Sequence, residues 1–257
     1  MPEIELKRCK FCQKEVDRLV DSHVIPRSFY EYSKKIAGMD RSDYMEMKSN
    51  IKGSYTQKVQ IGWYDDGLVC SECEKLFGTY DKYASELLLQ NEQNHLKLTH
   101  EDKLIGWRIE DVNFQKLKMF FLTILWRAGA SDKFQFSKIQ LGIWNKRIEK
   151  CIRDGSTEGV EGISFIIARF PDENGKSSIL NPHKEPKGGI FSSLNMYRFY
   201  LGAGFIIYIK IDNRPFPEQY SCLASSEGGP LVILCRQELL ESAEGALMKK
   251  ILLACQR

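Results

Sequence analysis

Two matched C-x-x-C pairs constrain this chain more than any other feature of its 257 residues. They are CKFC at 9–12 and CSEC at 70–73. A C-x-x-C turn lets two thiolates approach one ion from the same side, and a second such turn completes a tetrahedron. The two pairs together predict one structural zinc ion, held by Cys9, Cys12, Cys70 and Cys73, around which residues 1–90 fold.

Other interpretations of these cysteines stay open from the sequence. The four thiols could be reduced and without a ligand, or one pair could be a redox site. A thioredoxin-like redox site has a single C-x-x-C where a strand meets a helix, which two distant pairs do not fit. The other four cysteines lie among apolar neighbours, and we expect them to be small buried residues; they are Cys151, Cys222, Cys235 and Cys255.

Charge and hydropathy exclude several protein classes. The N-terminus MPEIELKRCKFC is charged and lacks the apolar segment of a signal peptide. The longest apolar runs, such as 119–126, are too short to span a bilayer. We therefore expect a soluble cytoplasmic protein with reduced thiols and no membrane partner. A net charge of +3 falls below that of strongly cationic nucleic-acid binders, so any phosphate-binding surface must be local.

Apolar periodicity predicts helices in the second half of the chain. One helix has a core-facing stripe formed by Phe114, Leu117, Phe120, Phe121, Ile124 and Leu125. A second is expected over 137–153 with Gly155 placed to stop it, its inward residues being Ile139, Trp144, Ile148, Cys151 and Ile152. A last amphipathic helix is expected over 237–255. The polar stretch 90–103 is interpreted as a connector or an exposed helix end.

Runs of β-branched and aromatic residues predict strands at 163–170, 195–201, 205–211 and 231–235. The segment Gly202-Ala203-Gly204 is expected to be a tight hairpin or a bulge. The fold class is therefore α+β. We expect a zinc-binding module over 1–95 and an α+β domain of unknown role, with a small mostly antiparallel sheet, over 96–257.

A polar and β-branched segment between the cysteine pairs resembles part of a known family. Residues 21–27 (DSHVIPR) fit a short strand ending in a turn, and residues 72–89 fit a helix. This arrangement resembles the zinc-knuckle branch of the HNH endonucleases, which have a ββα-metal fold. In that fold a C-x-x-C pair is followed by a His-Ile-Ile-Pro-like strand and then by a C-x-x-C pair that opens a helix. The match covers the first third of the chain and is carried by Cys9, Cys12, HVIP at 23–26, LVC at 68–70 and Cys73.

The resemblance implies hydrolysis of phosphodiester bonds in nucleic acid, DNA ahead of RNA. His23 would act as the general base, Glu74 is the second catalytic candidate, and a catalytic Mg²⁺ or Mn²⁺ ion is expected. The candidate ligands of that ion are Ser22, Asp66, Glu74 and Asp81. Ser22, Asp66 and Glu74 replace residues common in the family, namely an Asp or His, an Asn and a His. Glu74 and Asp81 lie about two helical turns apart, so both can face one side of a helix.

Basic and tyrosine residues are interleaved between the cysteine pairs and favour a nucleic-acid surface, with Arg27, Lys52 and Lys58 as candidates. Interleaved acidic residues leave a mixed-charge face open. The remaining histidines are interpreted as solvated (His95 and His100) or in a loop (His183).

Proteins of this kind are often bacterial or phage-borne, and some act in antiviral defence. A protein partner or a homo-oligomer stays open. The departures at Ser22, Asp66 and Glu74 also favour a second hypothesis, a non-catalytic zinc-binding adaptor that binds nucleic acid or a partner protein.

Overall fold

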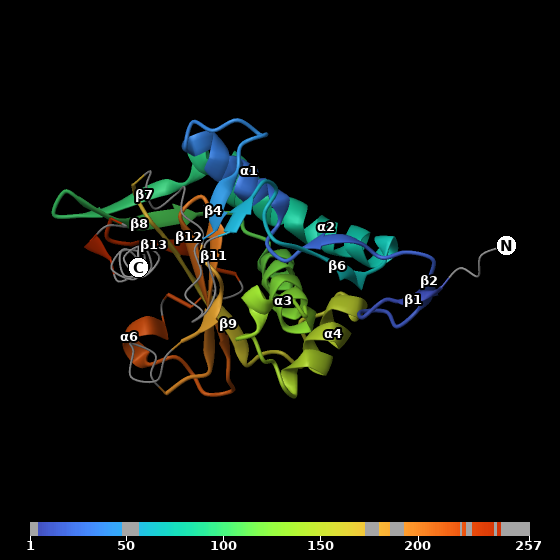
Figure 1. Ribbon diagram of the computed structural model, residues 1–257. Helices are drawn as coiled ribbons and strands as arrows, with labels where there is room; N and C mark the ends of the chain where they lie inside the picture. Colours follow the sequence, from blue (N-terminus) through green and yellow to red (C-terminus); the bar gives the residue numbers. More distant parts are fainter. Residues whose placement is uncertain are drawn as a thin grey trace, which may run out of the picture.

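The computed structural model describes residues 5–47, 57–172, 180–185, 193–221, 223–224, 228–238 and 241–242. Its centre is a seven-stranded sheet with helices packed against one face (Figure 1). The strand order is β10 (His183–Lys184), β11 (Met196–Gly202), β12 (Phe205–Ile211), β9 (Ile163–Arg169), β13 (Leu231–Cys235), β8 (Lys103–Ile109) and β7 (Leu96–His100). Neighbours are antiparallel except β9 and β13, which run parallel. The α+β class is confirmed, and the sheet is larger than expected.

The four strands predicted from β-branched and aromatic runs are β9, β11, β12 and β13, and their bounds agree with the expected ranges to within one residue. Residues 202–204 form both a hairpin and a bulge. The register shifts between Tyr200 and Gly202, and all three turn residues have positive φ. Ala203 at φ 53° shows that this turn accepts a side chain in the left-handed region.

The interpretation of 90–103 as a connector or a helix end is wrong. This stretch contains a 3₁₀ turn, η2 (Glu92–Asn94), and the strand β7, which pairs with β8 at the sheet edge. Both faces of β7 are largely exposed, so its sequence lacks the apolar alternation that marks a half-buried strand. In β8, Gly106 allows close approach of the neighbouring strand, since a Cβ there would lie 2.5 Å from the carbonyl oxygen of Ile233.

Helices α3 (Phe114–Ala130) and α4 (Trp144–Asp154) pack beside the sheet (Figure 1). The first helix was predicted correctly. The second begins later than expected, because a 3₁₀ turn, η3 (Phe134–Phe136), and Gly142 at φ 55° interrupt the segment that precedes it. Gly155 ends α4 in the left-handed conformation, as predicted. The helix expected over 237–255 falls almost entirely outside the described residues.

The N-terminal third forms smaller elements on the far side of α3. The strands β1 (Lys7–Arg8) and β2 (Glu15–Val16) make a hairpin, and β4 (Met45–Met47) and β5 (Gln57–Val59) make another. The strand β3 (Val20–His23) pairs antiparallel with β6 (Tyr64–Val69). Helix α1 (Arg27–Ile36) follows β3, and helix α2 (Ser71–Ser85) follows β6 and continues into a π-helical turn, η1 (Glu86–Gln90).

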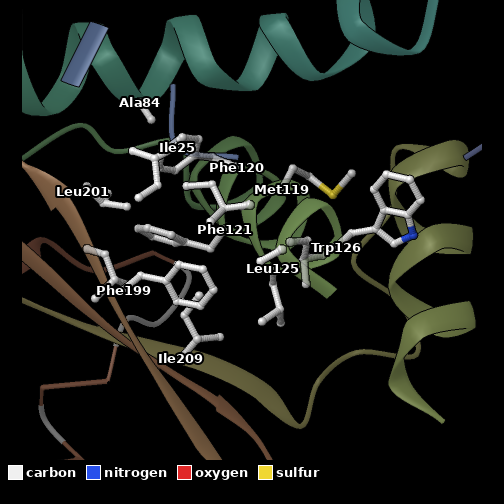
Figure 2. Packing of buried hydrophobic residues seen from close by; sticks show 14 of the residues in the cluster. Ile25, Ala84, Met119, Phe120, Phe121, Leu125, Trp126, Phe199, Leu201 and Ile209 are labelled. Atoms are coloured by element: carbon white, nitrogen blue, oxygen red, sulfur yellow. The ribbon is translucent and has the colours of Figure 1, made fainter. Parts of the chain in front are cut away.

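Helix α3 is buried on nearly all sides and joins the N-terminal elements to the sheet. Figure 2 shows Ala84 and Ile25 above Phe120 and Phe121 of α3, with Leu201 beside Ile25, and Phe199 and Ile209 of the sheet below Phe121. The ring of Phe121 lies 4.3 Å from that of Phe165 in β9. One hydrophobic cluster therefore runs without a break across residue 95, from Cys9 to Ile233.

The other face of the sheet has a smaller hydrophobic cluster. Its buried residues include Ile166, Met196, Ile206 and Phe216, and it lies beside the short helix α6 (Glu218–Ser221). Both faces of the central strands are thus covered, which explains their nearly continuous apolar sequences. Among the described residues, none of the helices has the length and apolar character needed to cross a membrane.

Candidate functional site

The four cysteines of the two C-x-x-C pairs converge on one point. Their sulfur atoms all lie within 4.8 Å of one another. The Sγ–Sγ distances are 3.8 Å for Cys9 and Cys73, 3.8 Å for Cys12 and Cys70, and 3.6 Å for Cys70 and Cys73. Four thiolates at a Zn–S distance of about 2.3 Å in a tetrahedron lie about 3.8 Å apart. The sulfur positions therefore fit a zinc ion, and the four residues could hold one.

Local backbone geometry explains how each pair is presented. In the first knuckle the Gln13 amide donates to the Cys9 carbonyl at 2.9 Å, with Gln13 in the left-handed region. In the second, Cys70 is the N-cap of α2 and Cys73 lies in its first turn. The positive end of a helix favours thiolates there. The Cys70 amide also points at Cys9 Sγ, 3.4 Å away, which joins the two knuckles.

The cysteines outside the cluster agree in part with expectation. Cys151 is buried and donates to the carbonyl of Glu158, 3.0 Å away. Cys235 is only partly buried. Cys222 and Cys255 lie outside the described residues.

A second feature is a pocket of about 340 Å³ beside the first turn of α1. It brings together three residues singled out in the sequence, His23, Glu74 and Asp81, together with Arg27. The remaining lining residues are Pro26, Ser28, Lys82, Ser85 and Gln90. The strand pair β3–β6 presents His23, and α2 presents the two carboxylates.

His23 is held in one tautomer. Its Nε2 atom lies 3.0 Å from the carbonyl oxygen of Ile61. A carbonyl oxygen can only accept, so Nε2 carries the proton and Nδ1 is left as an acceptor. Burial lowers the pKa of His23, and the nearby guanidinium groups of Arg127 and Arg27 lower it further. The imidazole is therefore neutral at neutral pH.

Glu74 and Ser22 each have a buried polar atom that lacks a hydrogen-bond partner within the described ranges, and of the two only Glu74 lines the pocket with His23. Glu74 Oε2 and Ser22 Oγ are both buried, and among the described residues neither has a hydrogen-bond partner at normal geometry. Burial raises the pKa of Glu74, and the nearby Ser22 hydroxyl and Arg127 guanidinium oppose this rise. Buried polar atoms without partners are rare and are expected where a ligand or ion completes the site.

Asp81 does not stand free in the pocket. Its two carboxylate oxygens accept from Arg127 at 2.7 and 2.9 Å. The Arg127 side chain is fully buried in α3, and it also donates to the carbonyl of His23 at 2.5 Å. Burial raises the pKa of Asp81, and the guanidinium opposes this rise. A metal ion at Asp81 would have to displace a guanidinium that already neutralises the carboxylate.

Asp66 lies outside the pocket. Its side chain is 67% exposed and pairs with Lys133 at 3.1 Å. Side chains alternate along β6, so the neighbouring Asp65 is the one that turns inward, opposite Ser22 in the strand pair. Asp65 accepts from the hydroxyl of Ser131 at 2.6 Å. Of the basic candidates, Arg27 lines the pocket, Lys58 is exposed on β5, and Lys52 lies outside the described residues.

Sequence reasoning missed Arg127. The signal was present, because an arginine inside the apolar run FFLTILWR must find a partner once that run is buried. The expectation that His95 is solvated is wrong. His95 is buried, and its Nε2 lies 2.9 Å from the carbonyl of Leu87 in the π-helical turn. His100 is exposed as expected, while His183 lies in the short strand β10 rather than in a loop.

No family model, no curated protein and no solved structure matches this chain. Within the part of the chain that the structure describes, the four cysteines are the one group of three or more metal-binding side chains close enough to share an ion. Function is therefore inferred from the geometry of the cysteine cluster and of the His23 pocket.

Proposed function

We propose that this protein is an HNH-type endonuclease in which a zinc ion on four cysteines holds His23 next to a phosphodiester, DNA ahead of RNA. The observation that carries the proposal is His23 itself. It is neutral, its Nε2 is occupied by the carbonyl of Ile61, its Nδ1 is an acceptor, and it lines a pocket with Glu74. The order β3, β6, α2, with one cysteine pair before β3 and the other at the start of α2, supports a ββα-metal module.

The chemistry follows from these groups. Nδ1 of His23 takes a proton from a water molecule, whose oxygen attacks phosphorus while the bond to the 3′ oxygen breaks. A bound Mg²⁺ or Mn²⁺ would polarise the phosphate and stabilise the leaving oxygen. Glu74, which lines the pocket, and Ser22, which lies close to Glu74, would hold that ion. Both offer oxygen atoms of the kind it prefers, and neither Glu74 Oε2 nor Ser22 Oγ has a hydrogen-bond partner among the described residues.

The first turn of α1 supports phosphate binding at the same pocket. Ser28 and Arg27 line it, no acidic residue lies in that turn, and the Arg27 side chain is 55% exposed. Free amide groups at a helix N-terminus favour anions. The proposed substrate would thus meet a base, an oxygen ligand set and the first turn of a helix in one place, with the Arg27 guanidinium paired to Glu31 at its edge.

Cleavage assays test the proposal. Supercoiled plasmid, single-stranded DNA and RNA are incubated with the protein and Mg²⁺ or Mn²⁺. Loss of a general base costs about 10²- to 10⁴-fold in rate, so His23→Ala should lose cleavage by that factor. The matched control is His100→Ala, an exposed histidine away from the pocket, which should cleave at the wild-type rate. Equal cleavage by His23→Ala and wild type would contradict the proposal.

A second function is favoured by one observation. Arg127 occupies both oxygens of Asp81, which removes a carboxylate from the expected ligand set. A non-catalytic zinc-binding adaptor needs no such set. The wild-type protein would then bind nucleic acid or a protein partner and cleave no nucleic acid with either metal ion.

A further inference from the structure

A groove lies along α1 beside the His23 pocket. A second hollow of about 460 Å³ lies next to it and shares two lining residues with it, Ser28 and Gln90. Beyond them the second hollow is lined by Tyr32, Lys35, Met39 and Arg41, among others. Helix α1 forms one wall, and the π-helical turn η1, through Leu89 and Gln90, forms the other. The two hollows are therefore neighbours along α1, and the second one, called the groove below, lies on the side of Ser28 and Gln90 away from His23.

Two cations in this groove are not neutralised. Lys35 and Arg41 are exposed and form no ion pair within the described ranges. Two acidic residues line the groove, Glu31 and Asp40. Glu31 is already paired with Arg27 at 3.0 Å. Unpaired cations spaced along a channel are the usual footprint of a phosphate backbone.

Buried Lys34 holds this wall in place. Its Nζ atom donates to the carbonyls of Arg41 and Asp43, at 2.9 and 2.6 Å, and to that of Gln60. The segment that carries Arg41 is therefore tied back to α1. These hydrogen bonds fix the position of Arg41 relative to Lys35 on α1.

Tyr32 is the aromatic residue of the groove, and its ring is held firmly. Its hydroxyl donates to the carboxylate of Glu92. Glu92 is paired at 2.5 Å with Arg169, which is 1% exposed at the end of β9. The Arg169 guanidinium lies 4.7 Å from the ring centre of Phe205. Burying an arginine is costly unless it is paired, so Arg169 holds Glu92 in place, and Glu92 in turn holds the hydroxyl of Tyr32.

We propose that the groove binds an unpaired nucleic-acid strand, with one base stacked on Tyr32 and backbone phosphates at Lys35 and Arg41. A base inside a duplex is already stacked on both faces and cannot lie on a tyrosine ring, whereas single-strand binders combine cationic channels with such aromatic platforms. The proposal rests on the proposed function in one respect, since it takes the strand to continue into the His23 pocket.

Binding is measured by fluorescence anisotropy on the full chain carrying His23→Ala, without added divalent ions, so that no strand is cut. The probes are a labelled single-stranded DNA, the RNA of the same sequence and the corresponding DNA duplex. We expect a single strand to bind at least about tenfold more tightly than the duplex. The DNA and RNA arms identify which strand the groove prefers.

Groove variants are compared on the same background. Lys35→Glu with Arg41→Glu should weaken single-strand binding and reduce the slope of log affinity against log salt by about 1.4, two phosphate contacts at about 0.7 each. Tyr32→Leu should weaken binding by about tenfold or more, while Tyr32→Phe keeps the ring and most of the affinity. The matched control is Lys97→Glu with Lys103→Glu, two exposed lysines on the β7–β8 hairpin.

Three results would contradict the proposal that the groove binds a single strand. They are no binding of any strand, equal binding of duplex and single strand, or groove variants that bind as tightly as the hairpin control. Thermal unfolding of each variant identifies a folding defect in Tyr32→Leu, and the two surface charge reversals still decide the question in that case. If the protein binds a single strand in the groove but cleaves no nucleic acid, the nuclease proposal is wrong and the proposal of single-strand binding is retained.

Discussion

Arg127 in α3 forms a bidentate ion pair with Asp81 in α2, with hydrogen bonds of 2.7 and 2.9 Å, and the same guanidinium donates to the carbonyl of His23. This one buried side chain therefore ties the helix that follows the second cysteine pair to the strand that presents the histidine. The sheet-bearing part of the chain, through α3, thus sets the position of His23. Arg127, which is far from the cysteines in sequence, therefore helps to position the candidate site.

Replacing Arg127 should be strongly destabilising. Arg127→Met leaves the Asp81 carboxylate buried without a partner, which typically costs about 3–5 kcal/mol of unfolding free energy. Adding Asp81→Asn to Arg127→Met should recover part of the loss. Urea denaturation of both variants gives the values. The control Arg147→Met removes an exposed arginine that packs on Trp144 and should cost less than about 1 kcal/mol. An Arg127→Met variant as stable as the control would show that the pair contributes little.

Metal analysis should find one zinc ion per chain. Four sulfurs at tetrahedral spacing saturate one site, so Cys73→Ala should lose the metal and much of the folded state. Cys151→Ser should keep both, because Cys151 is bonded to a carbonyl away from the cluster. Zinc-free protein with native circular dichroism and four titratable cluster thiols would refute the zinc site.

Helix α3 makes the two parts of the chain depend on each other. A fragment of residues 96–257 would expose the face of α3 that packs on Phe29 and Ile25. We expect this fragment to lack a cooperative melt in calorimetry, whereas the full chain melts cooperatively. A sharp melt of the fragment alone would place an independent domain after residue 95, the boundary expected from the sequence.

Buried His95 should make stability depend on pH. Burial lowers the pKa of His95 below its ordinary value of about 6.5, so the unfolded chain binds a proton more readily than the folded chain does. The stability that this neutral histidine contributes is present above about pH 6.5 and is lost as the pH falls below that value. The free-energy difference between wild type and His95→Gln should therefore shrink from pH 7 to pH 5. His100→Gln, at an exposed site, serves as the comparison, and a difference independent of pH would contradict the argument.

Glu74→Gln separates metal binding from the proton step. Losing one charged oxygen ligand should raise the Mg²⁺ or Mn²⁺ concentration needed for half-maximal cleavage, with partial rescue at high metal. Glu72→Gln lies on the exposed side of the same helix and should leave the metal dependence unchanged. Loss of cleavage in Glu74→Gln that no metal concentration restores would assign Glu74 a role other than metal ligand.

Local patterns were enough to predict much of the fold. The strands β9, β11, β12 and β13, the stripe of α3 and the stop at Gly155 all follow from apolar periodicity and glycine placement. The edge strand β7 was missed because an exposed strand needs no apolar alternation.

The sequence by itself determined the cysteine cluster, because ligand spacing and tetrahedral chemistry together leave few ways to use four thiols, and it brought His23 and Glu74 forward as neighbours of that cluster. Only the tertiary structure decided what surrounds them. The turning of Asp65 inward and Asp66 outward depends on the register of β3 against β6, and the pairing of Asp81 with Arg127 depends on how α2 packs on α3. The groove along α1, with Tyr32 anchored through Glu92 to Arg169, joins residues far apart in the chain. Such pairings depend on long-range packing, which places a buried charge of one element against an opposite charge of another. The sequence of either element can show that a partner is needed, but it does not identify that partner.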